Sequence, residues 1–141
     1  TEKETHMLSH KPTLNAALAR SALDAALRAA STNGLTMSVA VVDDGGYPLC
    51  LERMDGAGLL TAKVASEKAR TSALLRAPSR VLADRVAADP ALLRLTDYLP
   101  MTGGLPIMAE GRCIGAIGVS GGTPEQDEQT GQAGIEAMRL D

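Results

Sequence analysis

Polar and apolar residues follow a helical period in the first structured part of this chain. Between Thr13, a residue type that begins helices, and Asn33, one that ends them, the charged residues Arg20, Asp24 and Arg28 lie four positions apart. Leucines and alanines occupy the other positions that would face a core. The spacing predicts an amphipathic helix between these two ends.

Shorter apolar runs predict two pairs of strands. Residues 37–43 are apolar on both sides of the pleat, which is typical of an inner strand covered on both faces. A turn at Asp44-Gly45-Gly46 returns the chain as residues 47–53, and residues 106–109 and 112–120 turn about Glu110-Gly111. Because short turns join these strands, we expect antiparallel pairing and an α+β fold.

Helical patterns fill most of the remaining chain. They predict helices over residues 60–75 and 79–88, and a last helix that begins at the cap Thr123 and ends near residue 139. Residues 92–102 are ambiguous. We expect a single domain over residues 13–141, preceded by a flexible tail over residues 1–12.

Charge and composition exclude several classes of function. The 141 residues carry 14 basic and 17 acidic side chains, a net charge of −3, which disfavours nucleic acid and membrane surfaces as partners. No apolar run approaches the roughly 20 residues of a membrane span, and no leader is recognisable, so we expect a cytoplasmic protein. With no Phe or Trp, the core consists of small side chains, and we expect a subunit interface to add stability.

The most informative segment for chemistry is the glycine-rich run at residues 115–128. Acidic residues already occupy the start of the following helix, and no Lys follows the glycines, so a phosphate site is disfavoured. One interpretation is a turn capped by its own acids. The other is that Gly118, Ser120 and Gly121 let a small carboxylate or a flat ring lie against bare backbone.

Three side chains are candidates for catalysis. Arg53 and Asp55 leave a strand for a loop, where Arg53 would clamp a carboxylate and Asp55 would accept a proton; the alternative is an ordinary Asp-Gly turn. Lys68 lies on the apolar flank of its helix, where burial would suit it to acid–base work or to binding an anion. The alternative is that its ammonium group reaches solvent.

Metal and haem ligands are few. The histidines, His6 and His10, both lie in the tail, and we expect no metal site. Non-covalent haem could use Tyr47, Met54, Met101 or His6 as its axial ligand. A Ser or Cys nucleophile would lack a histidine within the domain.

Five motifs in order resemble the GlcG/HbpS family, which is similar to the C-terminal domain of the PduO adenosyltransferases. They are residues 39–49, 53–57, 67–71, 103–107 and 115–128, and the resemblance covers about residues 13–139. It implies a five-stranded antiparallel sheet with packed helices, layered as in profilin, and homo-oligomers from dimer to octamer. The chain differs from relatives that carry His after the Gly-Gly turn, because Tyr47 occupies that position here.

Two functions follow from these observations. The first is a small-ligand-binding protein of the GlcG/HbpS type that binds or slowly degrades haem. The second is a cofactor-independent isomerase, lyase or cyclase that uses acid–base chemistry on a carbonyl or carboxylate substrate, through Arg53, Asp55 and Lys68. In either case the expected ligand-binding residues are Tyr47, Gly103, Gly104, Gly118, Ser120 and Gly121, and we expect the glycines and the three catalytic candidates to share one cavity.

Overall fold

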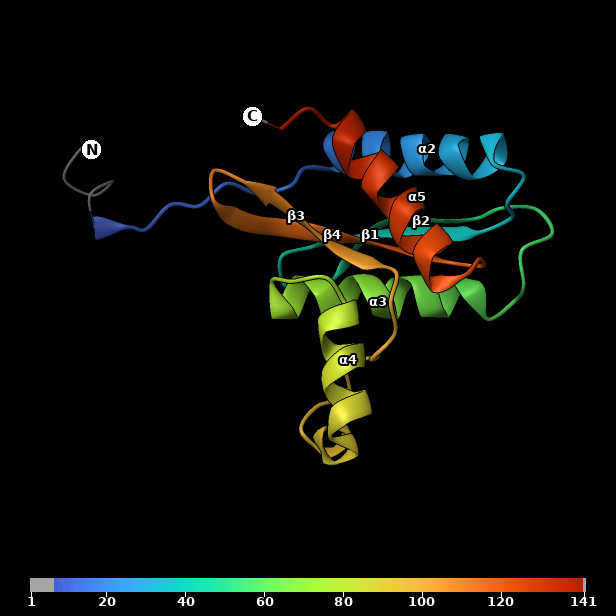
Figure 1. Ribbon diagram of the computed structural model, residues 1–141. Helices are drawn as coiled ribbons and strands as arrows, with labels where there is room; N and C mark the ends of the chain where they lie inside the picture. The colour runs from blue at the N-terminus through green and yellow to red at the C-terminus, as the bar shows by residue number, and fades with distance from the viewer. Residues whose placement is uncertain (1–6, 141) are drawn as a thin grey trace.

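The fold is known from a computed structural model that describes residues 7–140 (Figure 1). In chain order, its elements are α2 (Ala16–Thr32), β1 (Ser38–Asp43), β2 (Pro48–Arg53), α3 (Thr61–Leu75), α4 (Arg80–Ala88), the 3₁₀ helix η1 (Pro90–Arg94), β3 (Gly104–Ala109), β4 (Arg112–Ser120) and α5 (Pro124–Ala137). The expected tail lies outside the described residues as far as residue 6. Residues 9–15, which lead into α2, form neither helix nor strand.

The N-cap of the first helix lies two residues later than predicted. Asn15, not Thr13, caps α2, and its side-chain oxygen accepts a hydrogen bond from the Leu18 N–H at 2.9 Å. Both residue types cap helices well, so the sequence alone did not distinguish them. At the other end Asn33 is the C-cap, as predicted.

The four strands predicted from the pattern form one antiparallel sheet in the order β2-β1-β4-β3. The inner position of β1 is confirmed, because Val41 lies between Cys50 of β2 and Ile117 of β4. The five-stranded sheet that the resemblance implied is wrong for the described residues. The ambiguous segment before β3 forms η1 and a loop instead of adding a strand at the β3 edge.

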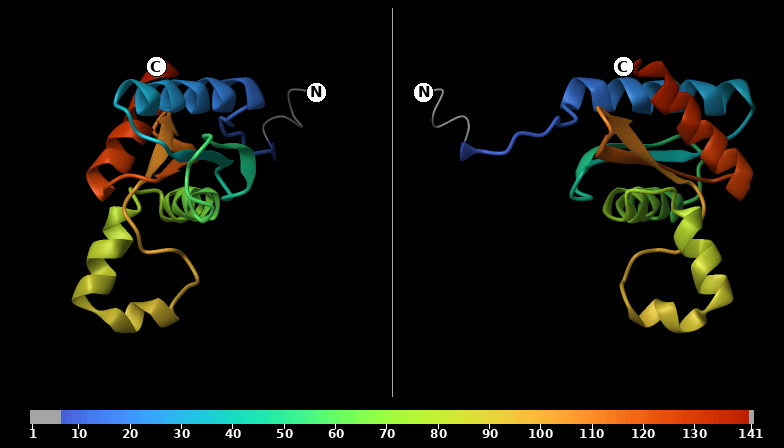
Figure 2. Two further views of the ribbon diagram at one scale, coloured as in Figure 1. Left: turned by 90° about the vertical axis from the view of Figure 1, so that its right-hand side faces the viewer. Right: turned by 60° about the vertical axis from the view of Figure 1, so that its left-hand side comes forward.

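Helices cover both faces of the sheet (Figures 1 and 2). α2 and α5 pack together on one face, and α3 lies across the other. The main core, between the sheet and the pair α2 and α5, includes Leu23, Met37, Val39 and Ile117, which are fully buried. On the α3 face only small side chains intervene, so the helix backbone approaches the sheet closely.

One part of the chain extends away from these layers. α4, η1 and the loop to β3 form an arm (residues 80–103) that projects beyond α3 (Figure 2). Its base is fixed by the buried Ser79, whose hydroxyl donates to the Met101 carbonyl oxygen at 2.6 Å and accepts from the Gly104 N–H at 2.8 Å. Leu93 and Leu95 on the arm are more than half exposed.

Candidate functional site

A buried ion pair joins α3 to α5 at the end of β4. Lys68 Nζ lies 2.9 Å from Asp127 Oδ2, and both side chains are at most 4% exposed. The same ammonium group donates to the Val119 carbonyl oxygen at 3.0 Å. The other carboxylate oxygen of Asp127 accepts from the Gly122 N–H at 2.9 Å. A lysine that the sequence placed on an apolar flank is thus held inside the protein with a counter-charge.

Local sequence explains how the two charges come to be buried together. Gly103 leaves room for the lysine, because a Cβ there would lie 2.8 Å from Lys68 Nζ. Asp127 lies in the first turn of α5, which a capping box between Thr123 and Gln126 fixes in place. A carboxylate is favoured in this turn because the helix dipole is positive there.

Two opposing effects act on the pKa of the Asp127 carboxyl group. Burial raises the pKa of the carboxyl above its ordinary value, because the charged form loses solvation. The hydrogen bonds from Lys68 and from the Gly122 N–H offset part of this effect. Asp127 therefore holds a proton to higher pH than an exposed aspartate would.

The ion pair forms one wall of a cavity of about 310 Å³, which we call the inner chamber. Thr102 and Ser120 also line it, and neither hydroxyl forms a hydrogen bond within residues 7–140. The remaining lining is largely apolar, from Ala83, Pro100, Met101 and Pro124. The chamber thus offers an ammonium, a carboxylate and two hydroxyls to a small molecule.

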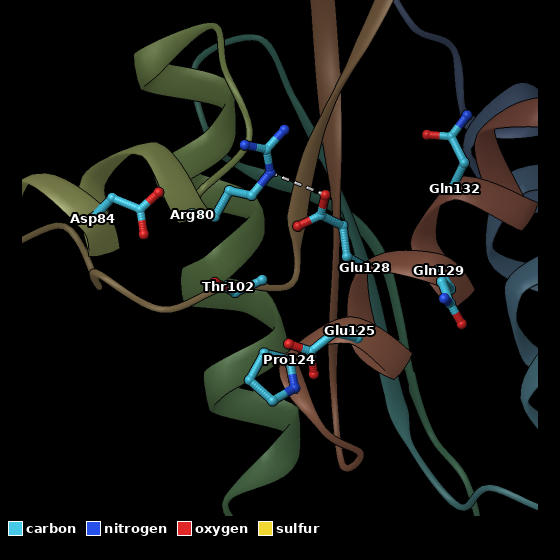
Figure 3. Close-up of a pocket in the computed structure, with 8 residues that line it drawn as sticks. All are labelled: Arg80, Asp84, Thr102, Pro124, Glu125, Glu128, Gln129 and Gln132. Atoms are coloured by element: carbon cyan, nitrogen blue, oxygen red, sulfur yellow. Dashed lines mark hydrogen bonds and ion pairs between the residues drawn. The ribbon is translucent and has the colours of Figure 1, made fainter.

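A second cavity, the outer chamber, adjoins the first and has a volume of about 480 Å³. Thr102 and Pro124 line both cavities. Figure 3 shows Arg80 of α4 facing Glu128 of α5, at 3.2 Å between the guanidinium Nε and the carboxylate. Two further acids, Asp84 and Glu125, line the outer chamber, so it carries an excess of negative charge.

A third cavity, of about 320 Å³, lies at the opposite end of the sheet, between the β1–β2 and β3–β4 turns. We call it the hairpin-end cleft. Three cationic side chains line it together with one acid and two sulfur-containing side chains: Lys11, Arg76, Arg112, Asp44, Cys113 and Met108. Lys11 pairs with Asp44 at 2.6 Å, and the hydrogen bond from Lys11 lowers the pKa of that carboxyl.

The structure brings together only part of the predicted site. Lys68 and Ser120 line the inner chamber. Arg53, at the end of the edge strand β2, and Asp55, in the loop after it, are both exposed and line none of the three cavities. The expectation of one cavity shared by Arg53, Asp55 and Lys68 is therefore wrong for these three cavities: Arg53 and Asp55 are exposed, whereas Lys68 is buried.

The predicted glycines pack against the chain itself. A Cβ on Gly118 would collide with the Ala65 carbonyl oxygen, and one on Gly104 with the Lys68 carbonyl oxygen, both on α3. Gly121 is close to the Thr36 carbonyl oxygen, and Gly103 to Lys68. None of these four lines a cavity described above. Tyr47 is 72% exposed in the β1–β2 turn, next to the hairpin-end cleft but not in its lining.

Sequence reasoning missed the partner of Lys68. Asp127 was interpreted only as an acid that favours the start of a helix, and that interpretation is compatible with its position. Thr102 lay in the segment without a clear pattern. The available signal was an acid in the first turn of a helix that follows a buried strand, in a chain that also has a lysine on an apolar helix face.

Comparisons with known proteins identify the family of this chain. The family model described as "Haem degrading protein HbpS-like" matches residues 14–136. This chain belongs to the HbpS-like family. Within it, the Escherichia coli strain K12 protein GlcG is 36% identical over 111 residues, which are 78% of this chain and 83% of GlcG.

Solved structures of relatives have the same fold. A double mutant of HbpS from Streptomyces reticuli superposes with a TM-score of 0.85 at 37% identity, covering 92% of this chain and 90% of that one. A complex of the PduO C-terminal domain with haem superposes with a TM-score of 0.84 at 27% identity, covering 92% and 98%. The resemblance to the GlcG/HbpS family is thereby confirmed. In the part of the chain that the structure describes, no helix is long and apolar enough to span a membrane.

Proposed function

We propose that this chain is a small-ligand-binding protein of the HbpS type and that haem is its ligand. The fold is shared with a domain whose structure contains haem, and the match covers nearly the whole length of both chains. The observation within this chain that carries the proposal is the lining of the hairpin-end cleft, which combines sulfur side chains with cations.

The residues of the cleft suit haem by their chemistry. The Cys113 thiol and the Met108 thioether are of the kinds that bind haem iron, and the phenol of Tyr47 lies in the adjoining turn. The cations Arg76 and Arg112 would pair with the two propionates. When bound, haem would supply the redox chemistry of its iron, and these residues would hold it.

Haem titration of the purified protein tests this assignment. We expect a saturable Soret band at one haem per chain, which Cys113→Ala shifts or weakens. Cys50→Ala is the matched control, because Cys50 is partly buried in β2 and lines none of the three cavities. Tyr47→Phe distinguishes a phenolate ligand from a thiolate. Non-stoichiometric binding, unaffected by all three variants, would overturn the proposal.

Slow haem degradation is a finer part of the same proposal, and the family description suggests it. With ascorbate as reductant and dioxygen as oxidant, we expect the Soret band of the complex to decay faster than that of free haem. Decay that is equal in both samples would leave binding without degradation.

A homo-oligomer is also part of the proposal. Leu59, Leu60, Leu93 and Leu95 are all more than half exposed, in a chain whose core contains no Phe or Trp. Burial of these leucines in a subunit interface would add stability. Light scattering after size exclusion should show an assembly larger than one chain, and Leu95→Glu should dissociate it; a monomeric wild type would contradict the proposal.

A second candidate function is acid–base catalysis on a carbonyl substrate, as in an isomerase, lyase or cyclase. The observation that favours it is the Lys68–Asp127 pair in the wall of the inner chamber. Lys68 would polarise the carbonyl group, and the Asp127 carboxylate, made more basic by burial, would accept a proton from the substrate and return it. Roles for Arg53 and Asp55 stay predictions. Such an enzyme must first bind a carbonyl compound beside Lys68, which is measurable without knowledge of the reaction.

A further inference from the structure

We infer that the inner chamber binds an uncharged carbonyl compound, such as an amide, lactam or ketone, with its carbonyl oxygen accepting a hydrogen bond from Lys68. This inference rests on the second candidate function and narrows its substrate class from carbonyl or carboxylate to neutral carbonyl. It concerns a site separate from the hairpin-end cleft, because no residue lines both cavities.

The first argument is a count of hydrogen-bond donors. A lysine ammonium has three N–H groups, and within residues 7–140 Lys68 has two acceptors, the Asp127 carboxylate and the Val119 carbonyl oxygen. One donor of a side chain that is only 2% exposed is left for a molecule in the chamber. A buried donor without a partner is costly, so an acceptor there is favoured.

The second argument is charge. Asp127 already neutralises Lys68, so the inner chamber offers a carboxylate ligand no net positive charge. The adjoining outer chamber sets one cation, Arg80, against the acids Asp84, Glu125 and Glu128. An anion would therefore lose its hydration and meet repulsion without compensation. An uncharged acceptor avoids both costs.

The third argument is the remaining lining. The hydroxyls of Thr102 and Ser120 have no hydrogen-bond partner within the described residues and are available to a second polar atom of the ligand. Ala83, Pro100 and Met101 provide apolar contacts for a short carbon chain. With a volume of about 310 Å³, the chamber has room for a small molecule.

The experiment compares two probes of nearly the same shape, propionamide and propionate, by titration of ¹⁵N-labelled protein. We expect propionamide to shift the amide signals of Thr102, Ser120 and Gly122 saturably. The dissociation constant of propionate should be larger than that of propionamide by a factor of about ten or more. Ala83→Leu, which fills the chamber, should abolish these shifts. Ala87→Leu is the matched control on the same helix, because Ala87 is exposed and outside the chamber lining.

A double variant guards against a failure to fold. Lys68→Met combined with Asp127→Leu removes both buried charges at once and should retain the fold by circular dichroism while losing the propionamide shifts. If propionate binds as well as propionamide, the neutral-ligand inference fails and the second candidate function survives. If neither probe binds the wild type, both fail, whereas haem binding is measured separately by its Soret band.

Discussion

Lys68 and Asp127 come from helices on opposite faces of the sheet, yet their side chains meet at 2.9 Å beyond the end of β4. Both residues are buried, and both line the inner chamber. It therefore affects both the stability of the fold and the chemistry of the inner chamber.

Removal of one member of this pair should destabilise the protein strongly. In Lys68→Met the carboxylate of Asp127 stays buried without its counter-charge, and we expect the free energy of unfolding to fall by about 3–5 kcal/mol. Replacement of both residues by apolar ones should recover most of this loss. Urea denaturation of the single and double variants measures the difference.

The surface pair provides the control for that experiment. Arg80 and Glu128 are much more exposed, so Arg80→Met should cost about 1 kcal/mol or less. Equal losses in Arg80→Met and Lys68→Met would show that burial of the Lys68–Asp127 pair has no special effect on stability.

Gly118 should not tolerate a side chain. A Cβ there would collide with the Ala65 carbonyl oxygen of α3, so Gly118→Ala must move the helix away from the sheet. We expect a loss of about 1–3 kcal/mol in thermal or urea unfolding. Gly131→Ala within α5 is the matched control, because its Cβ would make ordinary contacts at 3.5 Å with Ile117 and Leu105 of the sheet, and it should stabilise by up to about 1 kcal/mol.

The raised pKa of Asp127 predicts a pH dependence of stability. The cause is burial, and the folded protein therefore binds this proton more tightly than the unfolded chain does. The contribution of Asp127 to stability is complete below its ordinary pKa of 3.8 and declines as the pH rises through the raised value. The difference in free energy of unfolding between wild type and Asp127→Asn should decline over the same range. A difference that grows with pH would show that the ion pair outweighs burial.

Ser79 should control the attachment of the arm. In Ser79→Ala the Met101 carbonyl oxygen loses its donor and the Gly104 N–H its acceptor. We expect a loss of about 1–3 kcal/mol and faster amide hydrogen exchange over residues 90–103. Ser31→Ala, on the exposed surface near the end of α2, should leave exchange in the arm unchanged.

The elements of the fold were largely predictable because each has a local cause. Alternating and continuous apolar runs indicated the four strands, and the cap at Thr123 marked the start of α5 as observed. The fifth strand came from the resemblance rather than from the residues, and it is absent from the described chain. Local pattern was the better guide to the number of strands.

The site was harder to predict because it depends on contacts between distant segments. Burial of Lys68 was one of two open interpretations, and its helical position supported it. That Asp127 would neutralise it depends on how α5 crosses the sheet, which no local pattern encodes. Arg53 has a residue type and a strand-end position suited to a site, but its side chain is exposed and lines none of the three cavities.

The placement of the two charges on α3 and α5 has a consequence for fragments of this protein. A truncated chain that ends before α5 keeps the lysine and the strands but has no carboxylate to receive the ammonium group. Such a fragment cannot bury Lys68 without desolvating a lone cation, so the lysine would be driven toward water and the neighbouring helix displaced. Competence to bind at this chamber should consequently arise only when synthesis of the last helix is finished.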